Sequence, residues 1–364
     1  MQNKIGLKNL LIKHYNQYPQ AQLKDMVKFI YQHEFGSGHL VTDETASLKR
    51  LQEEYLALKE HSYDRKSSAA IFEEIGNGLC RLNLSKLQDT GLNLTTVNRF
   101  FLNTAKMTRG SMESFEKKLE VLKECCRDGI LPYAIKELKA YLQDYQSQGY
   151  PPVRHSEEFR QAYSPAYRVV KTEYRDFFKL FCKIDVLMKA KNRTFAAIDG
   201  NSGAGKTNLA ALLREIYDAN IFHMDDFFLT PELRTEERLK EVGGNVDYLR
   251  FKEEVIGGLE SGEEFYYRRY DCHKQAFVER VRVVPKPVNI IEGVYSMHPT
   301  LIDYYDLKVF LGIDSEEQGK RILQRNGAKM YQRFLVEWIP MENRYFEEMN
   351  IEEQADLIFK NNEL

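Results

Sequence analysis

A chain of 364 residues is long enough for two or three domains, and its 43% hydrophobic and 29% charged residues provide for a buried core. These proportions exclude wholesale disorder. With 52 Lys and Arg against 54 Asp and Glu, the net charge of −2 gives no general field that would draw the chain onto nucleic acid or an anionic membrane.

The charge is distributed unevenly along the chain. Residues 1–190 hold 29 basic and 23 acidic residues, a net charge of +6, whereas residues 191–364 hold 23 and 31, a net charge of −8. This change of sign predicts a domain boundary near residue 190. The excess of positive charge suits either docking against the acidic half or holding an anionic substrate, and both interpretations stay open.

The sequence indicates a reduced, cytoplasmic enzyme with neither a membrane nor a nucleic acid as partner. No run of 18 apolar residues occurs, and the N-terminus has no continuous apolar segment of the kind found in signal peptides. The cysteines are odd in number and form no CxxC pair, which argues against disulfides and zinc ribbons. They are Cys80, Cys125, Cys126, Cys182 and Cys272.

Residues 1–190 predict an all-helical domain of unknown role. Apolar residues recur at intervals of three and four, as at Leu48, Leu51, Tyr55 and Leu58, and no alternating strand pattern of useful length is visible. Glycine-containing segments such as 76–78 are interpreted as helix breaks.

Four polar residues of this half are candidates for a metal or proton-transfer site: His33, Glu34, His39 and His155. Their spacing matches no metal motif, because His33 and His39 are six residues apart and two glycines lie between them. Structural histidines and helix caps are the alternative explanation.

Residues 191–364 predict an α/β P-loop domain with a five-stranded, mainly parallel sheet. Five short apolar runs alternate with helical stretches, and continuous rather than alternating hydrophobicity is typical of strands that are covered on both faces. The runs are Thr194–Asp199, Ile221–Met224, Val288–Glu292, Lys308–Ile313 and Ala355–Phe359.

The first run leads directly into a phosphate-binding loop. The loop matches G-x-x-x-x-G-K-[ST] and precedes an amphipathic helix, the context that this motif requires. Its residues are Gly200, Asn201, Ser202, Gly203, Ala204, Gly205, Lys206 and Thr207. Glycines let backbone N–H groups surround phosphate oxygens, Lys206 adds a charge for the β- and γ-phosphates, and the Thr207 hydroxyl is a ligand for Mg²⁺. The motif predicts a site for a nucleoside triphosphate.

Two aspartates, Asp225 and Asp226, follow the second run. Ligands of open parallel sheets lie beyond the carboxyl ends of the strands, so a carboxylate there would face the γ-phosphate and accept a proton from an attacking hydroxyl. Capping of the next segment is the alternative role.

Three motifs in order, IDGNSGAGKT, HMDDFF and NIIEGVYS, resemble the uridine kinase and nicotinamide riboside kinase group, relatives of phosphoribulokinase. The resemblance covers residues 192–360. It implies that Asp225 is the general base and that Glu292 helps to hold Mg²⁺ in place of the usual aspartate. A strand-end acid without a ligand role is the alternative for Glu292.

The same resemblance implies residues on the substrate side. Asp247 lies where the family binds ribose hydroxyls, although it also fits a helix-start acid. Tyr270, Asp271 and His273 resemble the family's Tyr-Asp segment, but uridine kinases place the histidine later, and a surface aromatic next to a solvated histidine is the alternative.

A lid with arginines is also implied, after the fourth run. Arg321 and Arg325 are four residues apart on one helix face and are the candidates for contacting phosphate. Arg333 and Arg344 follow them.

Together these features predict an ATP- and Mg²⁺-dependent kinase that phosphorylates a hydroxyl of a nucleoside-like or other polyol metabolite. A nucleotide-gated switch whose helical domain recognises a partner is the alternative, and a second activity in residues 1–190 is a third hypothesis. The motifs specify neither the acceptor nor the oligomeric state.

Overall fold

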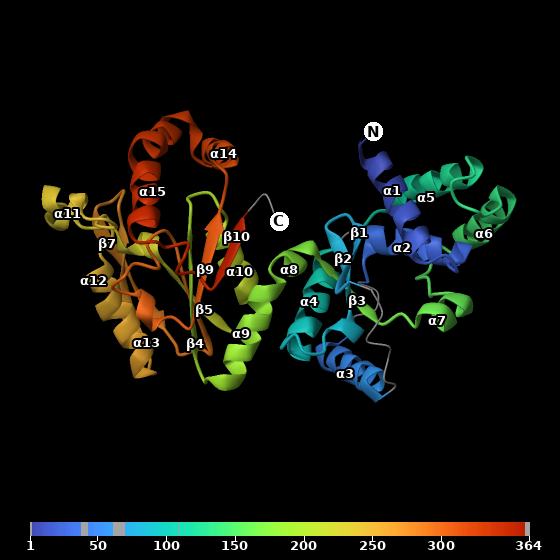
Figure 1. The fold of residues 1–364 in the computed structure, drawn as a ribbon, viewed down its shortest axis with the longest axis horizontal. Coiled ribbons are helices and arrows are strands. Elements are labelled where there is room, and N and C mark those ends of the chain that lie inside the picture. Colours follow the sequence, from blue (N-terminus) through green and yellow to red (C-terminus); the bar gives the residue numbers. More distant parts are fainter. Residues whose placement is uncertain (1, 38–42, 61–69, 109, 361–364) are drawn as a thin grey trace. The chain divides into compact units, whose positions relative to one another are not determined.

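A computed structural model describes residues 2–37, 43–60, 70–108 and 110–360 of the chain. The chain divides into two compact units, Met1–Cys182 and Lys183–Leu364, which Figure 1 shows as a ribbon. The division falls inside helix α9 (Phe178–Ala190), which ends at the residue where the charge distribution predicts a domain boundary. Within the described ranges, no helix is both long and apolar enough to cross a membrane.

The C-terminal unit is built on one parallel sheet of five strands in the order β10–β9–β4–β8–β5. In chain order the strands are β4 (Thr194–Gly200), β5 (Ala219–His223), β8 (Val288–Glu292), β9 (Leu307–Gly312) and β10 (Leu357–Lys360). Each strand overlaps one of the five predicted runs, so the predicted α/β fold is confirmed. The runs are continuous because both faces of the sheet are covered; all five residues of β8 are buried.

The register of the inner strands brings three chain segments to one edge of the sheet. Ile198 of β4 pairs with Glu292 of β8, and Glu292 pairs in turn with His223 of β5. The glycine loop after β4 and the two aspartates after β5 therefore begin at the same level. This edge is where ligands of parallel sheets bind.

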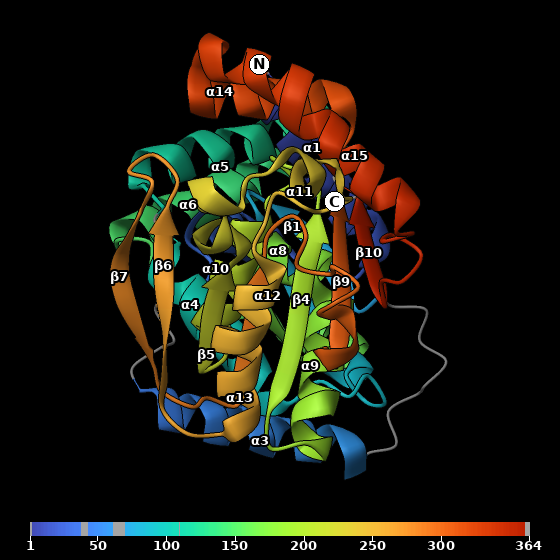
Figure 2. The ribbon, with the colours of Figure 1, turned by 90° about the vertical axis from the view of Figure 1, so that its left-hand side faces the viewer.

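Three longer helices belong to this unit: α10 (Lys206–Ile216), α14 (Ser315–Arg333) and α15 (Ile339–Glu348). Figures 1 and 2 show α14 and α15 beyond the carboxyl ends of the strands. The α14 backbone is kinked at Gly327, where φ is 76°. Shorter helical segments are η3 (Met224–Phe227), η4 (Pro231–Leu233), α11 (Glu236–Lys240), α12 (Tyr248–Phe251), η5 (Lys252–Ile256), α13 (Gly257–Ser261), η6 (Ile302–Tyr304) and η7 (Phe334–Trp338).

A two-stranded antiparallel hairpin, β6 (Phe265–Asp271) with β7 (Ala276–Val283), was not among the predicted elements. Charged residues interrupt the apolar residues of both strands and many positions are exposed, so no continuous apolar run marks either strand. Tyr267 and Val283 are buried in the core of the unit, and the Tyr267 ring lies against Phe222 and Phe227.

The N-terminal unit is helix-rich but not all-helical, which corrects the prediction for residues 1–190. It contains a three-stranded antiparallel sheet of β1 (Phe72–Gly76), β2 (Leu79–Asn83) and β3 (Tyr167–Lys171). The helices are α1 (Gln2–Gln17), α2 (Leu23–Phe35), α3 (Glu44–Glu60), η2 (Leu84–Lys86), α4 (Leu94–Met107), α5 (Met112–Arg127), α6 (Ile135–Ser147), α7 (Glu157–Tyr163) and α8 (Thr172–Asp176).

The missed sheet has a physical explanation. The glycine segment interpreted as a helix break is the β1–β2 turn, where Gly76, Asn77 and Gly78 all have positive φ. The first four residues of β2 are buried, so the strand does not alternate between polar and apolar residues. β3 pairs with β2 from far along the chain, a contact that no local pattern reveals.

Candidate active site

The glycine loop connects β4 to α10 along a path that its glycines permit. Gly200 has φ +133°, and a Cβ there would lie 2.0 Å from the carbonyl oxygen of Leu311 in β9. Gly205 has φ +102° and directly precedes the first residue of α10, Lys206. The loop thus ends on a helix N-terminus, where N–H groups and the helix dipole favour anions.

Lys206 and Ser202 fix the interior of the loop. The Lys206 ammonium donates to the carbonyl oxygens of Gly200, at 2.8 Å, and Asn201, at 3.0 Å. Ser202 donates its N–H (3.0 Å) and its hydroxyl to the carboxylate of Glu342 in α15. Burial raises the pKa of Glu342, and the nearby Lys206 charge opposes that rise. Sequence reasoning missed Glu342, which lies 140 residues from its partner.

The helix α14 also holds the loop. Gln318 donates from Nε2 to the Ser202 carbonyl oxygen at 3.0 Å. Arg321 donates from Nη1 to the Gly203 carbonyl oxygen at 3.4 Å and from Nε to Glu317 at 2.8 Å. Of the predicted lid arginines, Arg321 therefore touches the phosphate loop itself.

Thr207 and Glu292, the two predicted Mg²⁺ ligands, are in contact beside the loop. The Thr207 hydroxyl donates to Glu292 Oε1 at 3.1 Å, and His223 Nδ1 lies 2.5 Å from the same oxygen. Hydrogen bonding to Glu292 raises the pKa of His223, so the imidazolium form is favoured. His223 was not predicted, although it lies in the second apolar run, ends β5 and pairs with Glu292 in the sheet.

These oxygen donors fit Mg²⁺. Magnesium prefers oxygen ligands and keeps several of them as water or substrate phosphate, so one hydroxyl and one carboxylate are a sufficient protein share. Among the residues described, no group of three or more His, Cys, Asp or Glu side chains could hold a metal ion by itself. Thr207 and Glu292 suit a metal that a nucleotide completes.

Asp225 and Asp226 occupy η3 and have different surroundings. Tyr267 donates its hydroxyl to Asp226 Oδ2 at 3.3 Å, whereas no hydrogen bond or ion pair within the described ranges engages the Asp225 carboxylate. Desolvation and the negative charge of Glu292 raise the pKa of Asp225, although the residue is exposed by surface area. Asp225 is therefore the carboxylate that remains available to a ligand.

The predicted substrate residues lie on two elements. Asp247 is buried at the start of α12, where it accepts the Arg250 N–H at 3.1 Å and forms an ion pair with its side chain at 3.4 Å. It is thus a helix-start acid, and a buried one.

Tyr270, Asp271 and His273 come together at the tip of the β6–β7 hairpin. Tyr270 packs edge-on against Phe277, and Asp271 accepts the N–H groups of His273 and Lys274 in the turn. Burial, the charge of Asp271 and, to a smaller extent, the charge of Asp225 raise the pKa of the Cys272 thiol. The effect of Asp225 indicates that the hairpin tip lies near this aspartate.

The other lid arginines differ in their surroundings. Arg325 is exposed and donates to Asn326, yet its charge lowers the pKa of Asp225. Arg333 pairs with Glu337 and lies over the Trp338 ring, and Arg344 pairs with Glu348. Of these arginines, Arg321 therefore contacts the phosphate loop, and Arg325 affects the pKa of Asp225 through its charge.

A buried carboxylate that sequence reasoning missed ties the lid to the loop. Asp199 is fully buried at the end of β4 and accepts the N–H groups of Gly200 (2.7 Å) and Met297 (2.9 Å) and the Tyr345 hydroxyl (2.9 Å). Burial raises its pKa to about 6. Tyr345 belongs to α15, so the helix that supplies Glu342 is anchored at two points.

Part of the C-terminal unit is similar to known proteins. Residues 195–330 match the family described as phosphoribulokinase and uridine kinase. A protein described as a possible uridine kinase from Bacillus stearothermophilus is 22% identical, with coverage of 50% of this chain and 99% of that chain and a TM-score of 0.37. A protein proposed to be a fructose transport system kinase from Silicibacter sp. TM1040 is 23% identical, with coverage of 46% and 89% and a TM-score of 0.36.

The two solved structures cover about half of this chain, and at these scores they support no argument about its substrate. The family match spans β4, the phosphate loop, both aspartates, Glu292 and most of α14. Residues 195–330 are thus similar to the phosphoribulokinase and uridine kinase family, a family of P-loop kinases.

Proposed function

We propose that this protein transfers the γ-phosphoryl group of ATP to a hydroxyl of a nucleoside-like or other polyol metabolite. The observation that carries the proposal is the open Asp225 carboxylate at the same sheet edge as the phosphate loop and the Thr207–Glu292 pair. A nucleotide switch needs the loop and the metal ligands but has no use for an unpaired acid beside them.

In this proposal Lys206 and the loop N–H groups bind the phosphates, and Arg321 and Arg325 add positive charge where negative charge accumulates in the transition state. Thr207 and Glu292 would hold Mg²⁺, which supplies charge neutralisation to the phosphates when bound. The α14–α15 segment excludes water when it closes over the loop, which limits wasteful hydrolysis.

Asp225 accepts the proton of the acceptor hydroxyl. The hydroxyl oxygen forms a bond to the γ-phosphorus, the bond from that phosphorus to the β–γ bridging oxygen breaks, and ADP leaves with the electron pair. The raised pKa of Asp225 makes its carboxylate a stronger base than an ordinary aspartate.

The test is ADP release by the purified chain against a panel of hydroxyl-bearing metabolites. We expect acceptor-dependent turnover, and we expect Asp225→Asn to reduce it by about 10²–10⁴-fold. Asp226→Asn is the matched control, because Asp226 is already held by Tyr267 and should matter far less. Unchanged turnover in Asp225→Asn would show that the base is misassigned, and hydrolysis that no acceptor accelerates would favour the switch.

A further inference from the structure

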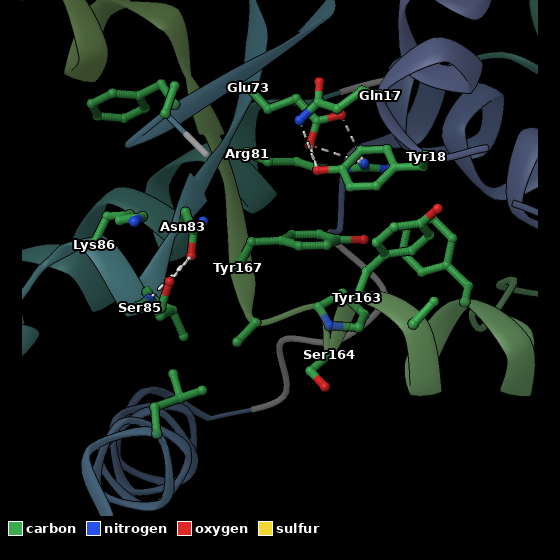
Figure 3. Close-up of a pocket in the computed structure, with 18 of the residues that line it drawn as sticks. Gln17, Tyr18, Glu73, Arg81, Asn83, Ser85, Lys86, Tyr163, Ser164 and Tyr167 are labelled. Carbon is green, nitrogen blue, oxygen red and sulfur yellow. Dashed lines mark hydrogen bonds and ion pairs between the residues drawn. The ribbon is translucent and has the colours of Figure 1, made fainter. Parts of the chain in front are cut away.

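The N-terminal unit contains a cavity of about 740 Å³ that the proposed kinase chemistry does not use. It lies between α1, α3, the β1–β3 sheet and α7, and Figure 3 shows its lining side chains. This volume is in the range of small-molecule sites.

Partly exposed aromatic rings form one wall of the cavity. The Tyr163 ring packs edge-on against two other rings, those of Tyr18 and Phe159, with centroid distances of 4.9 Å in both pairs. Figure 3 shows the Tyr167 ring in the middle, with Tyr18 and Tyr163 on one side and Asn83, Ser85 and Lys86 on the other. Rings that are left open to a cavity offer faces for stacking with a planar ligand.

The wall is held rigid by a buried ion pair. Arg81 is only 2% exposed, and its Nη1 donates to both oxygens of Glu73, at 3.1 and 3.2 Å. Its Nε and Nη2 donate to Gln32 Oε1, and the guanidinium lies 4.7 Å from the Tyr167 ring centroid. A buried ion pair contributes little net stability, so its value lies in fixing the side chains around it.

A second chain of contacts fixes the Tyr167 hydroxyl. His155 Nδ1 lies 2.9 Å from Asp25, and His155 Nε2 lies 2.6 Å from the Tyr167 hydroxyl. Asp25 also accepts the N–H and hydroxyl of Ser156 and is ionised, since these bonds lower its pKa to about 2 against the opposing effect of burial. His155 therefore donates from Nδ1, and Tyr167 donates its hydroxyl to Nε2.

The charges around the cavity favour an anion. Its lining contains Lys13, Lys59, Lys86 and Arg81 against Glu73 and Glu74. Arg81 and Glu73 neutralise one another, and Lys13 and Lys59 lie in the same lining as the remaining carboxylate, Glu74.

A shallow hollow of about 510 Å³ adjoins this cavity, since Ser164 and Pro165 line both. Its charged lining is Lys28, Arg154 and Arg160, with no carboxylate, and none of the three has an ion-pair partner within the described ranges. Burial and the charges of Arg81 and Arg160 lower the pKa of Lys28 to about 8. The Asp25 carboxylate, which lies against His155 of the lining, opposes the lowering of the Lys28 pKa and offsets part of this positive charge. With three cations near one carboxylate, the hollow keeps an excess of positive charge.

We propose that the N-terminal unit binds a small phosphorylated ligand with a planar ring, the chemistry of a nucleoside monophosphate. The ring lies against Tyr163 and Tyr167, and the phosphate lies at Arg154 and Arg160. This site belongs to a different unit from the phosphate loop and does not depend on the kinase proposal.

The test is calorimetric titration of the full chain carrying Lys206→Ala, which removes the charged side chain of the phosphate loop. The probes are AMP, GMP, UMP and CMP, with inorganic phosphate and the free nucleosides as comparisons. We expect at least one monophosphate to bind, and phosphate and nucleoside each to bind at least tenfold more weakly, because each lacks half of the recognised chemistry.

Arg154→Ala/Arg160→Ala should weaken monophosphate binding at least tenfold, and Tyr163→Leu should weaken it severalfold. The matched control is Lys136→Ala/Lys139→Ala, which removes two equally exposed cations from α6 and should change nothing. Circular dichroism of each variant checks that it is folded. The proposal fails if no monophosphate binds, if inorganic phosphate binds as tightly as the best monophosphate, or if both arginines can be removed without loss.

Discussion

Groups from four elements set the proton affinity of Asp225. Desolvation raises its pKa, and the negative charge of Glu292 on β8 adds to that rise. Lys206 on α10, His223 on β5 and Arg325 on α14 act in the opposite direction. A general base in this position is therefore adjusted by residues that never touch it.

Arg325→Met should raise the pKa of Asp225 further, because it removes a cation that stabilises the carboxylate. A base must be deprotonated to act, so the acidic limb of the pH profile of kcat/KM should move to higher pH. Arg344→Met, which removes another exposed arginine of the lid region with no effect on Asp225, should leave the limb in place. A limb that does not move in Arg325→Met, or moves equally in both variants, would contradict this assignment.

At the scale of elements, the pairing of β4 with β9 depends on the first glycine of the phosphate loop. Gly200 pairs with Leu311 at the end of both strands, and any side chain at this position would be driven into the β9 backbone. The same glycine is thus required by the sheet and by the loop that the sheet presents.

Gly200→Ala should destabilise the C-terminal unit by roughly 2–5 kcal/mol, because positive φ and displacement of β9 both cost free energy. Gly205→Ala is the matched variant: its φ is +102°, but no atom lies within 4 Å of the added Cβ, so only the backbone cost of roughly 1–3 kcal/mol applies. Denaturant unfolding followed by the fluorescence of Trp338, the single tryptophan, measures both. Equal decreases in the free energy of unfolding in the two variants would show that β9 can be displaced without destabilising the unit.

The elements that sequence analysis identified are those whose signal is local. The five parallel strands appear as continuous apolar runs, and the Gly200–Thr207 loop places its residues within eight positions. β6 and β7 were missed because charged residues interrupt their apolar residues and many positions are exposed. The β1–β3 sheet was missed because the pairing of β2 with β3 joins segments that are distant in sequence. Glu342 and Asp199 belong to the site through contacts across 140 and 146 residues, which no motif spacing encodes.

At the scale of the whole molecule, the two units contain buried titratable groups of opposite kinds. In the N-terminal unit, desolvation holds the pKa of His33 and His155 at about 4 and also lowers that of His14. In the C-terminal unit, desolvation raises the pKa of Asp199, to about 6, and of Glu342, although His298 there is lowered to about 4. Acid should therefore act differently on the two units.

We expect acid to destabilise the N-terminal unit first. Between pH 6.5 and pH 4 the histidines of the unfolded chain are protonated, whereas the buried histidines of the native unit stay neutral. The free energy of unfolding therefore decreases as the pH is lowered, by on the order of 2 kcal/mol at pH 5 for each of His33 and His155. The carboxyl groups of the C-terminal unit whose pKa is raised have the opposite effect on the free energy of unfolding. Between pH 6 and 3.8 native Asp199 is protonated more readily than unfolded Asp199, which stabilises the unit and offsets the loss from His298.

Calorimetry at pH 7 and pH 5, compared with melting followed through Trp338 in the C-terminal unit, separates the two responses. The N-terminal unit should give the calorimetric transition that is not accompanied by a change in Trp338 fluorescence. From pH 7 to pH 5 the midpoint of this transition should decrease by clearly more than the midpoint of the transition that Trp338 fluorescence follows. His33→Gln should reduce the pH dependence of that first transition, because it removes one of the three titrating groups while retaining an acceptor for Lys118, which lies 2.7 Å from His33 Nδ1. If His33→Gln melts with the pH dependence of the unmodified chain, or if both transitions shift equally, the assignment of acid sensitivity to the buried histidines is wrong.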